Sequence, residues 1–593
     1  MTGKHKHIHY MKIKQFIAAA AALILSACST LKDGEYNLSV VATGDGHGYW
    51  FAKPIEDGGR ARGSLMAQSA FVNGVRAEKG ADNVILIDAG DNFFGSGAPF
   101  YYNYVDTTSS HLYPRLASYM KYDAVVAGHS DFESGHRVYD RVAKEMKKEG
   151  IPLLAGNALS DRNGKPYFPA YSIIKKGGVK VAVLGYTNAA NASLMDGSCV
   201  SGLRFESLLP LVQEDVDKVR SKEKPHIVIV VAHTAMGKGD GLKLEKQGLD
   251  LFKSLRGVDV VVTGHDHANK VMSADSIVVL DCGRTGQNAG VTDIKLVVKG
   301  GKVVSRTLDA RMTSIKSEEY DTAMEEAFEA DYDKVRSFIT GTVGEIKKGL
   351  VSREFYYKQC DYMNFLHALA MSACPVDISL SATLLIDGKV PAGEVRYQDI
   401  RKVYPYENKL VVLRLTGAEI LKYLEASYDA WINTVTEPYE NAHVLKIKQS
   451  KDYSTGKMAW KLAKSPANFD SAAGINYTVD VTKPYGSRVV ITDMADGSKF
   501  ELDKEYTAAI TTYRSVGSGG LLKAAGLEDM KSVEDRIVYR GPEFRTILYR
   551  YFKKNGSIDP AVVGDPKVVG SWKFVPEFAP AAIKADVELL YGK

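Results

Sequence analysis

Five stretches of this 593-residue sequence place imidazole and carboxylate side chains directly after apolar runs. The runs are rich in Val and Ile and stop at Gly, Asp or His, which is typical of buried strands in an α/β sheet. Because ligands bind at the carboxyl ends of strands in such sheets, we expect the polar side chains to converge on one pocket. They are Asp45, His47, Asp88, Asp91, His129, Asp131, His233, His265 and His267.

Nitrogen and oxygen donors of these types can hold two divalent cations that share one carboxylate. Two such cations, about 3.5–4 Å apart, clamp the attacking and leaving oxygens of a phosphoryl transfer, and a hydroxide between them is a nucleophile at neutral pH. A lone strand-end histidine is more often a structural group than a ligand. The ordered series of five stretches therefore carries the prediction of a two-metal hydrolytic site.

Two successive parts of the chain must position these residues. From Asn37 to about Asp309, β-rich runs alternate with helical patterns, which indicates an α/β sandwich. A charged helical pattern over 317–339 follows, and a second domain then runs to the end of the chain. Within it, Thr416 and Glu419 have the spacing of a capping box and predict a strand that leads into a helix.

The N-terminus has the pattern of an export signal. A short apolar segment, too short to span a bilayer, ends in Leu25-Ser26-Ala27-Cys28, which resembles a bacterial lipobox. We expect a signal peptide over 1–27, lipid attached to Cys28, and a tether over 28–37; an ordinary secretory signal is the alternative. Ser29 after the cysteine favours an outer-membrane lipoprotein that faces the periplasm or the surface.

The charge and the cysteines exclude some classes of function. Four lysines of the leader account for most of the formal charge of +5, so no basic surface indicates nucleic-acid binding. Four cysteines lie outside the leader and its lipobox, and none has the spacing of a metal site. Sequence alone leaves their pairing open. They are Cys199, Cys282, Cys360 and Cys374.

The ordered series resembles the calcineurin-like metallophosphoesterase signature D-x-H, G-D, G-N-H-[ED], H and G-H-x-H. Later stretches such as INYTVDVTKPYGSRV and ITTYRSVGSGG extend the resemblance to the bacterial 5′-nucleotidase, UDP-sugar hydrolase and 2′,3′-cyclic-nucleotide phosphodiesterase family. This resemblance implies a four-layer α/β/β/α sandwich over 38–312 and an interdomain helix and linker over 313–345. It implies an α+β substrate domain of the 5′-nucleotidase type over 346–593.

The resemblance also implies two divalent ions (zinc, manganese or cobalt) and their ligands. One ion would be held by Asp45, His47, Asp91 and His267, and the other by Asp91, His129, His233 and His265. Asp91 would bridge the two, while Asp88 and Asp131 would orient ligands. In the second domain, Tyr406 and Tyr513 match the aromatic pair that stacks a nucleotide base.

The third motif departs from the family pattern G-N-H-[ED]-F-D. His129 takes the place of the ligand asparagine, Ser130 that of the catalytic histidine, and Glu133 that of the aspartate which orients it. Because a serine hydroxyl is never cationic near neutral pH, we expect activity lowered by roughly 10²–10⁴-fold, and raised again by histidine at position 130. A one-residue shift that makes His129 the catalytic group is the alternative.

A second departure concerns phosphate recognition. Nucleotidases of the family often carry N-G-G-G-[IL]-R, whereas residues 381–387 here contain no arginine. Phosphate recognition then comes from elsewhere, with Arg514 as one candidate, or the substrate is not a plain nucleoside monophosphate.

These observations predict an exported, lipid-anchored, monomeric two-metal phosphohydrolase acting on nucleotides through a metal-bridging hydroxide. The alternative is a catalytically impaired metal-binding relative that serves as a surface nucleotide-binding module. The complete ligand series argues against that alternative, because ligands released from function have no reason to be retained. A structural envelope protein with incidental histidines is a third hypothesis.

Overall fold

The computed structural model describes residues 31–60, 63–274, 276–406, 408–437, 443–451 and 457–592. The signal peptide and Cys28 lie outside these residues. The chain divides into two compact units between Asp333 and Lys334, within helix α11 (Glu329–Thr340), which falls in the predicted linker. Strand β1 (Gly34–Thr43) begins inside the tether predicted over 28–37. No helix of the described residues is long and apolar enough to cross a membrane.

The first unit contains two six-stranded sheets. The middle strands of each sheet run parallel. The second sheet has an antiparallel strand at both edges, whereas the first has antiparallel strands at one edge and a parallel strand at the other. One sheet has the order β14 (Lys302–Ser314), β13 (Asn288–Lys299), β1, β2 (Val84–Asp88), β3 (Ala124–Val126), β4 (Leu153–Leu154). The other has the order β11 (Asn269–Ala274), β12 (Ile277–Cys282), β10 (Val260–Thr263), β9 (Ile227–Ala232), β7 (Val179–Tyr186), β6 (Tyr171–Lys176).

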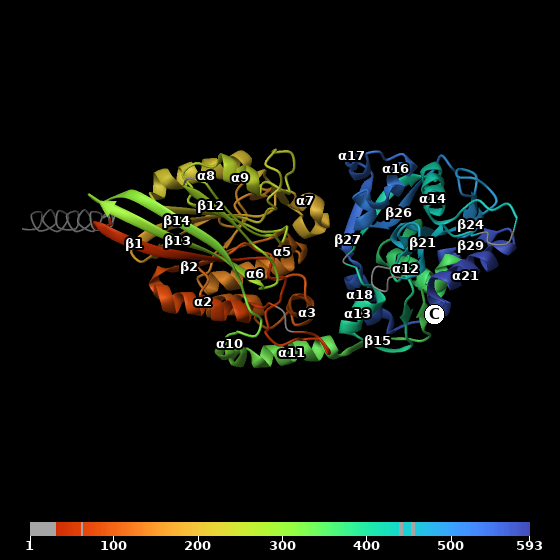
Figure 1. Cartoon of the computed structure of the whole chain (residues 1–593), viewed down its shortest axis with the longest axis horizontal. Helices are drawn as coiled ribbons and strands as arrows, with labels where there is room; N and C mark the ends of the chain where they lie inside the picture. The colour runs from red at the N-terminus through yellow and green to blue at the C-terminus, as the bar shows by residue number, and fades with distance from the viewer. Residues whose placement is uncertain are drawn as a thin grey trace, which may run out of the picture. The chain divides into compact units, whose positions relative to one another are not determined.

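The two sheets pack face to face through fully buried aliphatic side chains, among them Val40 and Ile85 of one sheet and Val181 and Ile229 of the other. Each such side chain contributes roughly 1.5–3 kcal/mol through burial. Helices cover the outer faces: α2 (Leu65–Lys79) and α6 (His136–Lys148) on one side, α8 (Leu208–Glu223) and α9 (Gly248–Ser254) on the other (Figure 1). The predicted four-layer α/β/β/α sandwich is confirmed.

The second unit is built on a five-stranded sheet. Its strand order is β23 (Asp470–Ala473), β17 (Ile378–Ala382), β26 (Glu505–Thr511), β20 (Lys409–Thr416), β27 (Ile537–Glu543). Strand β20 leads directly into helix α14 (Gly417–Trp431), and the predicted capping box is present. The Thr416 hydroxyl accepts from the Glu419 amide at 3.2 Å, and the Glu419 carboxylate accepts from the Thr416 amide at 2.7 Å.

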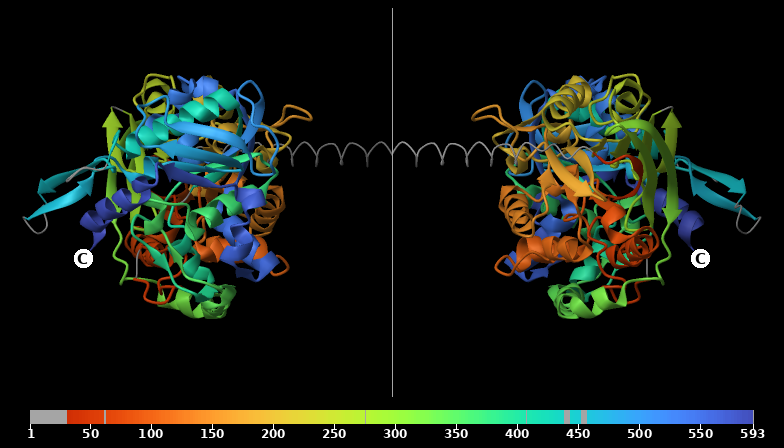
Figure 2. Two further views of the ribbon diagram at one scale, coloured as in Figure 1. Left: turned by 90° about the vertical axis from the view of Figure 1, so that its right-hand side faces the viewer. Right: turned by 90° about the vertical axis from the view of Figure 1, so that its left-hand side faces the viewer.

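A projecting hairpin and the state of the cysteines complete the description of the fold. The hairpin of β21 (Ile447–Lys451) and β22 (Met458–Leu462) projects from the rest of the second unit (Figure 2). No disulfide joins any of the four cysteines that follow the leader.

Candidate metal centre

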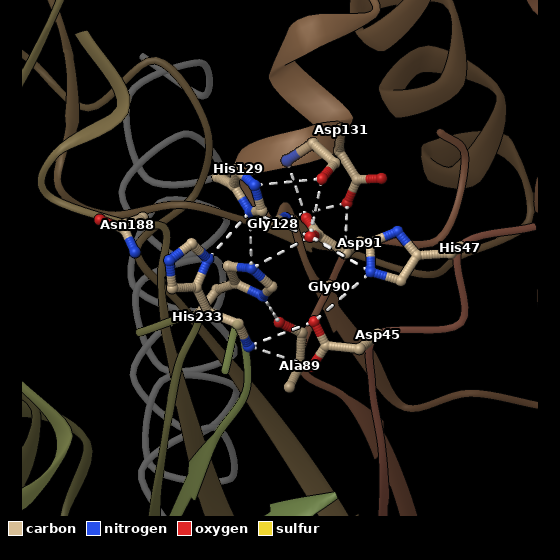
Figure 3. Close-up of polar contacts among 12 residues, drawn as sticks. Asp45, His47, Ala89, Gly90, Asp91, Gly128, His129, Asp131, Asn188 and His233 are labelled. Atoms are coloured by element: carbon tan, nitrogen blue, oxygen red, sulfur yellow. Dashed lines mark hydrogen bonds and ion pairs between the residues drawn. The ribbon is translucent and has the colours of Figure 1, made fainter. Parts of the chain in front are cut away.

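The carboxyl ends of parallel strands bring the predicted ligands together in the first unit. Asp45 and His47 follow β1, Asp91 follows β2, and His129 begins helix α5 (His129–Glu133) directly after β3. From the other sheet, His233 follows β9, and His265 and His267 follow β10. Figure 3 shows Asp91 lying among His47, His129 and His233. Seven residues that are far apart in sequence thus meet at one place.

The first cluster consists of His129, His233 and His265. His129 Nδ1 lies 3.1 Å from His233 Nε2 and 3.1 Å from His265 Nδ1. Metal–nitrogen bonds of about 2.0–2.1 Å place neighbouring ligand nitrogens about 3.0 Å apart in an octahedron and about 3.4 Å apart in a tetrahedron. The three nitrogens therefore have the spacing of ligands to a single cation.

The second cluster consists of Asp45, His47 and His267. The Nε2 atoms of His47 and His267 lie 3.0 Å apart, and Asp45 Oδ1 lies 3.5 Å from His267 Nε2. Asp91 Oδ2 joins the two clusters, at 3.0 Å from His129 Nδ1, 3.3 Å from His233 Nε2 and 3.9 Å from His47 Nε2. Asp91 Oδ2 therefore lies within 3.9 Å of histidines from both clusters.

Two histidines of the first cluster are oriented through their far nitrogens. His233 Nδ1 lies 2.8 Å from the Ala89 carbonyl, and His265 Nε2 lies 2.9 Å from Glu245 Oε1. Because a far nitrogen that donates to such an acceptor carries the proton, the near nitrogen presents a lone pair to the cluster. Sequence analysis missed Glu245, whose only signal is a carboxylate in the glycine-rich loop after β9.

Two aspartates support the loops that carry the ligands. The Asp131 carboxylate accepts from the amides of Asp91 and Gly128, both at 2.9 Å, and from those of Asn92 and Phe93. Asp88 accepts from the Gly90 amide at 2.7 Å. Both carboxylates thus hold backbone in place, which is the geometry expected of orienting groups.

The backbone at the ligands is unusual. Eight non-glycine residues of the described chain have positive φ, and five of them are predicted ligands: Asp45, His47, Asp91, His265 and His267. Left-handed backbone at a non-glycine residue costs roughly 1–3 kcal/mol and gathers at functional sites, where surrounding contacts enforce it. The strain is thus concentrated on the residues that converge at the strand ends.

The two buried carboxylates differ in their electrostatics. Burial raises the pKa of Asp45 well above its ordinary value. Burial also acts to raise the pKa of Asp91, but the charges of His129 and His233 outweigh it and hold that pKa well below its ordinary value. A divalent cation supplies the same kind of compensation, because it favours the ionised form of every carboxylate beside it.

Ser130 is directed at Asp91 and is only 5% exposed. Its amide donates to Asp91 Oδ1 and its hydroxyl to Asp91 Oδ2, both at 2.8 Å. In the family pattern the residue at position 133 orients a catalytic histidine, but position 130 holds a serine here. The Glu133 Oε1 atom lies 4.0 Å from His129 Nε2. His129 lies among the candidate ligands, which favours the ungapped register of the third motif over the one-residue shift.

The second unit has a cavity of about 120 Å³. Tyr406 and Tyr513, 48% and 40% exposed, both line it, so the structure brings the two predicted base-stacking residues to one place. Ser381 and Ala382, from the segment that lacks the family's arginine, also line it, as does the preceding Leu380. The other lining residues are Leu384, Asn408, Ala467, Asp470, Thr511 and Arg514.

Arg514 does not have the role in phosphate recognition that the sequence suggested for it. It is 3% exposed, and its Nε and one terminal nitrogen donate to the two oxygens of Asp470 at 3.0 and 2.5 Å. The remaining N–H groups donate to Asn468 Oδ1 and to the carbonyls of Ala467 and Ser518. Because a guanidinium has five N–H donors, none remains for a phosphate. Arg514 instead links residues 467–470 to Ser518.

Histidine and aspartate clusters at the strand ends of a four-layer α/β/β/α sandwich define the class of metallophosphoesterases. Residues 38–269 match the family model described as calcineurin-like phosphoesterase, and residues 341–526 match the one described as 5′-nucleotidase, C-terminal domain. The chain belongs to the family that joins these two domains, and its enzyme class is that of metal-dependent phosphoric ester hydrolases.

Relatives match along most of their length. A 5′-nucleotidase of Vibrio vulnificus is 24% identical, over 92% of this chain and 97% of the relative. A 2′,3′-cyclic-nucleotide 2′-phosphodiesterase/3′-nucleotidase of Yersinia enterocolitica is 22% identical, over 92% of this chain and 90% of the relative. Among solved structures, the NAD nucleotidase of Haemophilus influenzae has a TM-score of 0.59 at 14% identity, covering 91% of this chain and 100% of that one.

Proposed function

We propose that the chain is an exported, lipid-anchored phosphohydrolase of nucleotides that works with two divalent cations. The observation that carries the proposal is the position of Asp91, whose Oδ2 lies within 3.9 Å of histidines from both clusters. The Leu25-Ser26-Ala27-Cys28 motif supports export and lipid attachment, with the outer membrane as the proposed location.

The residues of the chain divide the work among them. When bound, two cations would supply a hydroxide nucleophile at neutral pH and would neutralise charge on the phosphoryl group. Ser130 keeps both oxygens of Asp91 in place, and Glu245 and the Ala89 carbonyl orient the histidines that face the cations. Since the Ser130 hydroxyl donates to Asp91, it does not protonate the leaving group.

Nucleotides are the proposed substrates, as nucleoside monophosphates or 2′,3′-cyclic phosphates. The names of the relatives support this class, and the exposed rings of Tyr406 and Tyr513 at one cavity provide faces on which a base can stack. The impaired nucleotide-binding module is less favoured, because Ser130, which suggested it, supports the ligand Asp91.

The test uses the purified mature protein with Mn²⁺, Zn²⁺ or Co²⁺ against AMP, 2′,3′-cyclic AMP, UDP-glucose and bis-p-nitrophenyl phosphate. We expect turnover of at least one nucleotide, two metal ions per chain by elemental analysis, and loss of both in Asp91→Ala. Asp82→Ala, which replaces an exposed aspartate of the same unit, is the matched control. Two bound metals without turnover of any of these substrates would refute the hydrolase and favour the binding module.

A further inference from the structure

Among the described residues, no basic side chain at the cavity of the second unit is available to bind the substrate phosphate. Arg514 is the one basic residue among the described lining residues, and its donors all have protein acceptors. A phosphate oxygen that does not face a metal ion still requires a donor, because an unpaired charge in a partly buried site is unfavourable. The first unit has such a donor beside the metal clusters.

Arg284 lies in the loop that joins β12 to β13. The backbone amides of its two neighbours donate hydrogen bonds to backbone carbonyls at the candidate metal centre. The Gly283 amide donates to the carbonyl of Ala268, the residue after His267, at 2.7 Å. The Thr285 amide donates to the carbonyl of Asp45 at 2.8 Å. The backbone of Arg284 is therefore fixed on both sides, next to the predicted ligands Asp45 and His267.

The loop around Arg284 is tightly constrained. Gly283, Thr285 and Gly286 have φ of 72°, 50° and 70°. A Cβ on Gly286 would lie 2.5 Å from the Ser64 backbone, and one on Gly63 would lie 2.5 Å from the Gly286 backbone. The loop thus packs against the start of helix α2, so Arg284 has a defined place at the rim of the site.

The guanidinium of Arg284 is available to a ligand. Its side chain is exposed, and within the described part of the chain no carboxylate, carbonyl or ring pairs with it. An unpaired arginine beside a cluster of candidate metal ligands is poised for an anion rather than for the protein itself.

We propose that Arg284 binds the substrate phosphate on the side of His47 and His267, and that it favours a terminal phosphomonoester over a phosphodiester. The inference rests on the proposed function. A guanidinium fork matches two phosphate oxygens at once. Because a terminal phosphate carries about two negative charges near neutral pH and a diester carries one, the attraction to Arg284 is greater for the monoester.

The experiment compares the metal-loaded full chain with Arg284→Ala, Arg284→Lys and the control Arg162→Ala, which removes an exposed arginine from a surface turn. Binding of inorganic phosphate is measured by titration calorimetry, and KM is measured for p-nitrophenyl phosphate and bis-p-nitrophenyl phosphate. For Arg284→Ala we expect phosphate affinity about tenfold or more weaker, a matching rise in KM for the monoester and a smaller rise for the diester. Arg284→Lys should be intermediate, and Arg162→Ala should match the parent.

Metal content separates binding from structure. It should stay unchanged in every variant, whereas loss of metal in Arg284→Ala would make the residue structural and overturn the inference. Phosphate affinity within twofold of the parent, or equal effects on monoester and diester, would also overturn it. A protein that binds metal and phosphate through Arg284 without hydrolysis would refute the proposed hydrolase and leave the assignment of Arg284 standing.

Discussion

Ser130 holds both oxygens of the Asp91 carboxylate, with its amide on Oδ1 and its hydroxyl on Oδ2, each at 2.8 Å. Sequence analysis assigned this serine to the place of a missing catalytic histidine. Its contacts instead make it a positioning residue for the carboxylate that joins the two clusters. The difference changes what substitutions at this position should do.

Histidine at position 130 should lower activity, contrary to the expectation from the family pattern. The imidazole is larger than the hydroxymethyl group that it replaces at a nearly buried site, and it would displace Asp91 or its neighbours. We expect both kcat and metal content to fall in Ser130→His. Ser130→Ala keeps the amide contact but loses a hydrogen bond to a charged group, so about a tenfold loss of metal affinity is expected. A rise in kcat for Ser130→His would restore the catalytic interpretation.

The leaving group should determine the rate strongly. Since the Ser130 hydroxyl is neutral and already donates to Asp91, protonation of the leaving oxygen receives no help from this position. A series of aryl and alkyl phosphomonoesters should therefore show kcat falling steeply as the pKa of the leaving alcohol rises. A flat series would indicate that another group of the chain acts as the general acid.

Glu245 should control metal affinity from outside the cluster. Its carboxylate accepts from His265 Nε2 at 2.9 Å, and loss of such a partner typically weakens metal binding 10–100-fold. Glu245→Ala is expected to behave in this way in competition with a chelator, while Glu245→Gln, which keeps an acceptor oxygen, should lose less. Glu214→Ala, on the exposed face of α8, is the control. Equal metal affinity in all variants would contradict the assignment.

The exposed tyrosines Tyr406 and Tyr513 should contribute to binding of the substrate's base and should not affect the hydrolysis step. Stacking of a base on an aromatic ring contributes roughly 1–3 kcal/mol, so Tyr406→Leu or Tyr513→Leu should raise KM for AMP about tenfold. KM for ribose 5-phosphate, which has no base, should stay the same. The phenylalanine variants keep the rings and should resemble the parent. If the leucine variants raise KM equally for AMP and ribose 5-phosphate, the tyrosines do not stack on the base.

His367 should make the second unit sensitive to acid. Burial lowers its pKa from 6.5 to about 4, and its two ring nitrogens lie 2.9 and 3.0 Å from the hydroxyls of Ser379 and Ser471. The unfolded chain binds a proton below pH 6.5 while the folded chain does not, so stability is lost as pH falls from 6.5 toward 4. The loss is on the order of 1–2 kcal/mol at pH 5.

Thermal unfolding in chelator at pH 7.5 and pH 5 tests this effect. His367→Gln should show a smaller drop in Tm between the two pH values than the parent. His136→Gln, which changes a partly exposed histidine of the first unit, should keep the parental difference. An unchanged drop in His367→Gln would mean that other groups carry the acid sensitivity.

The candidate metal ligands at the strand ends were predictable from the sequence, because the pattern that marks them is local. Each apolar run and the polar residues after it can be recognised within a few positions, and the parallel topology then brings Asp45, Asp91 and His233 together. The capping box at Thr416 was predictable for the same reason. These signals depend on short-range spacing and on a general rule of sheet architecture.

The partners of individual side chains could not be predicted, because they lie far away in sequence. Arg514 matches a substrate-binding motif, but its ion pair with Asp470 bridges 44 residues and uses the donors that a phosphate would need. Glu245 reaches His265 across 20 residues, from a loop with no motif of its own. Ser130 is adjacent to His129, yet its role depends on Asp91, 39 residues earlier.

The left-handed backbone at Asp45, His47, Asp91, His265 and His267 has a consequence for how this protein could change over time. Glycine adopts such conformations without strain, so at each of these positions it would relieve backbone strain while it abolished a ligand. A lineage that no longer needed the ligands would have a route to a more stable fold through these substitutions. All five positions keep carboxylate or imidazole side chains, so this chain retains residues that work against its own stability at the place where they converge.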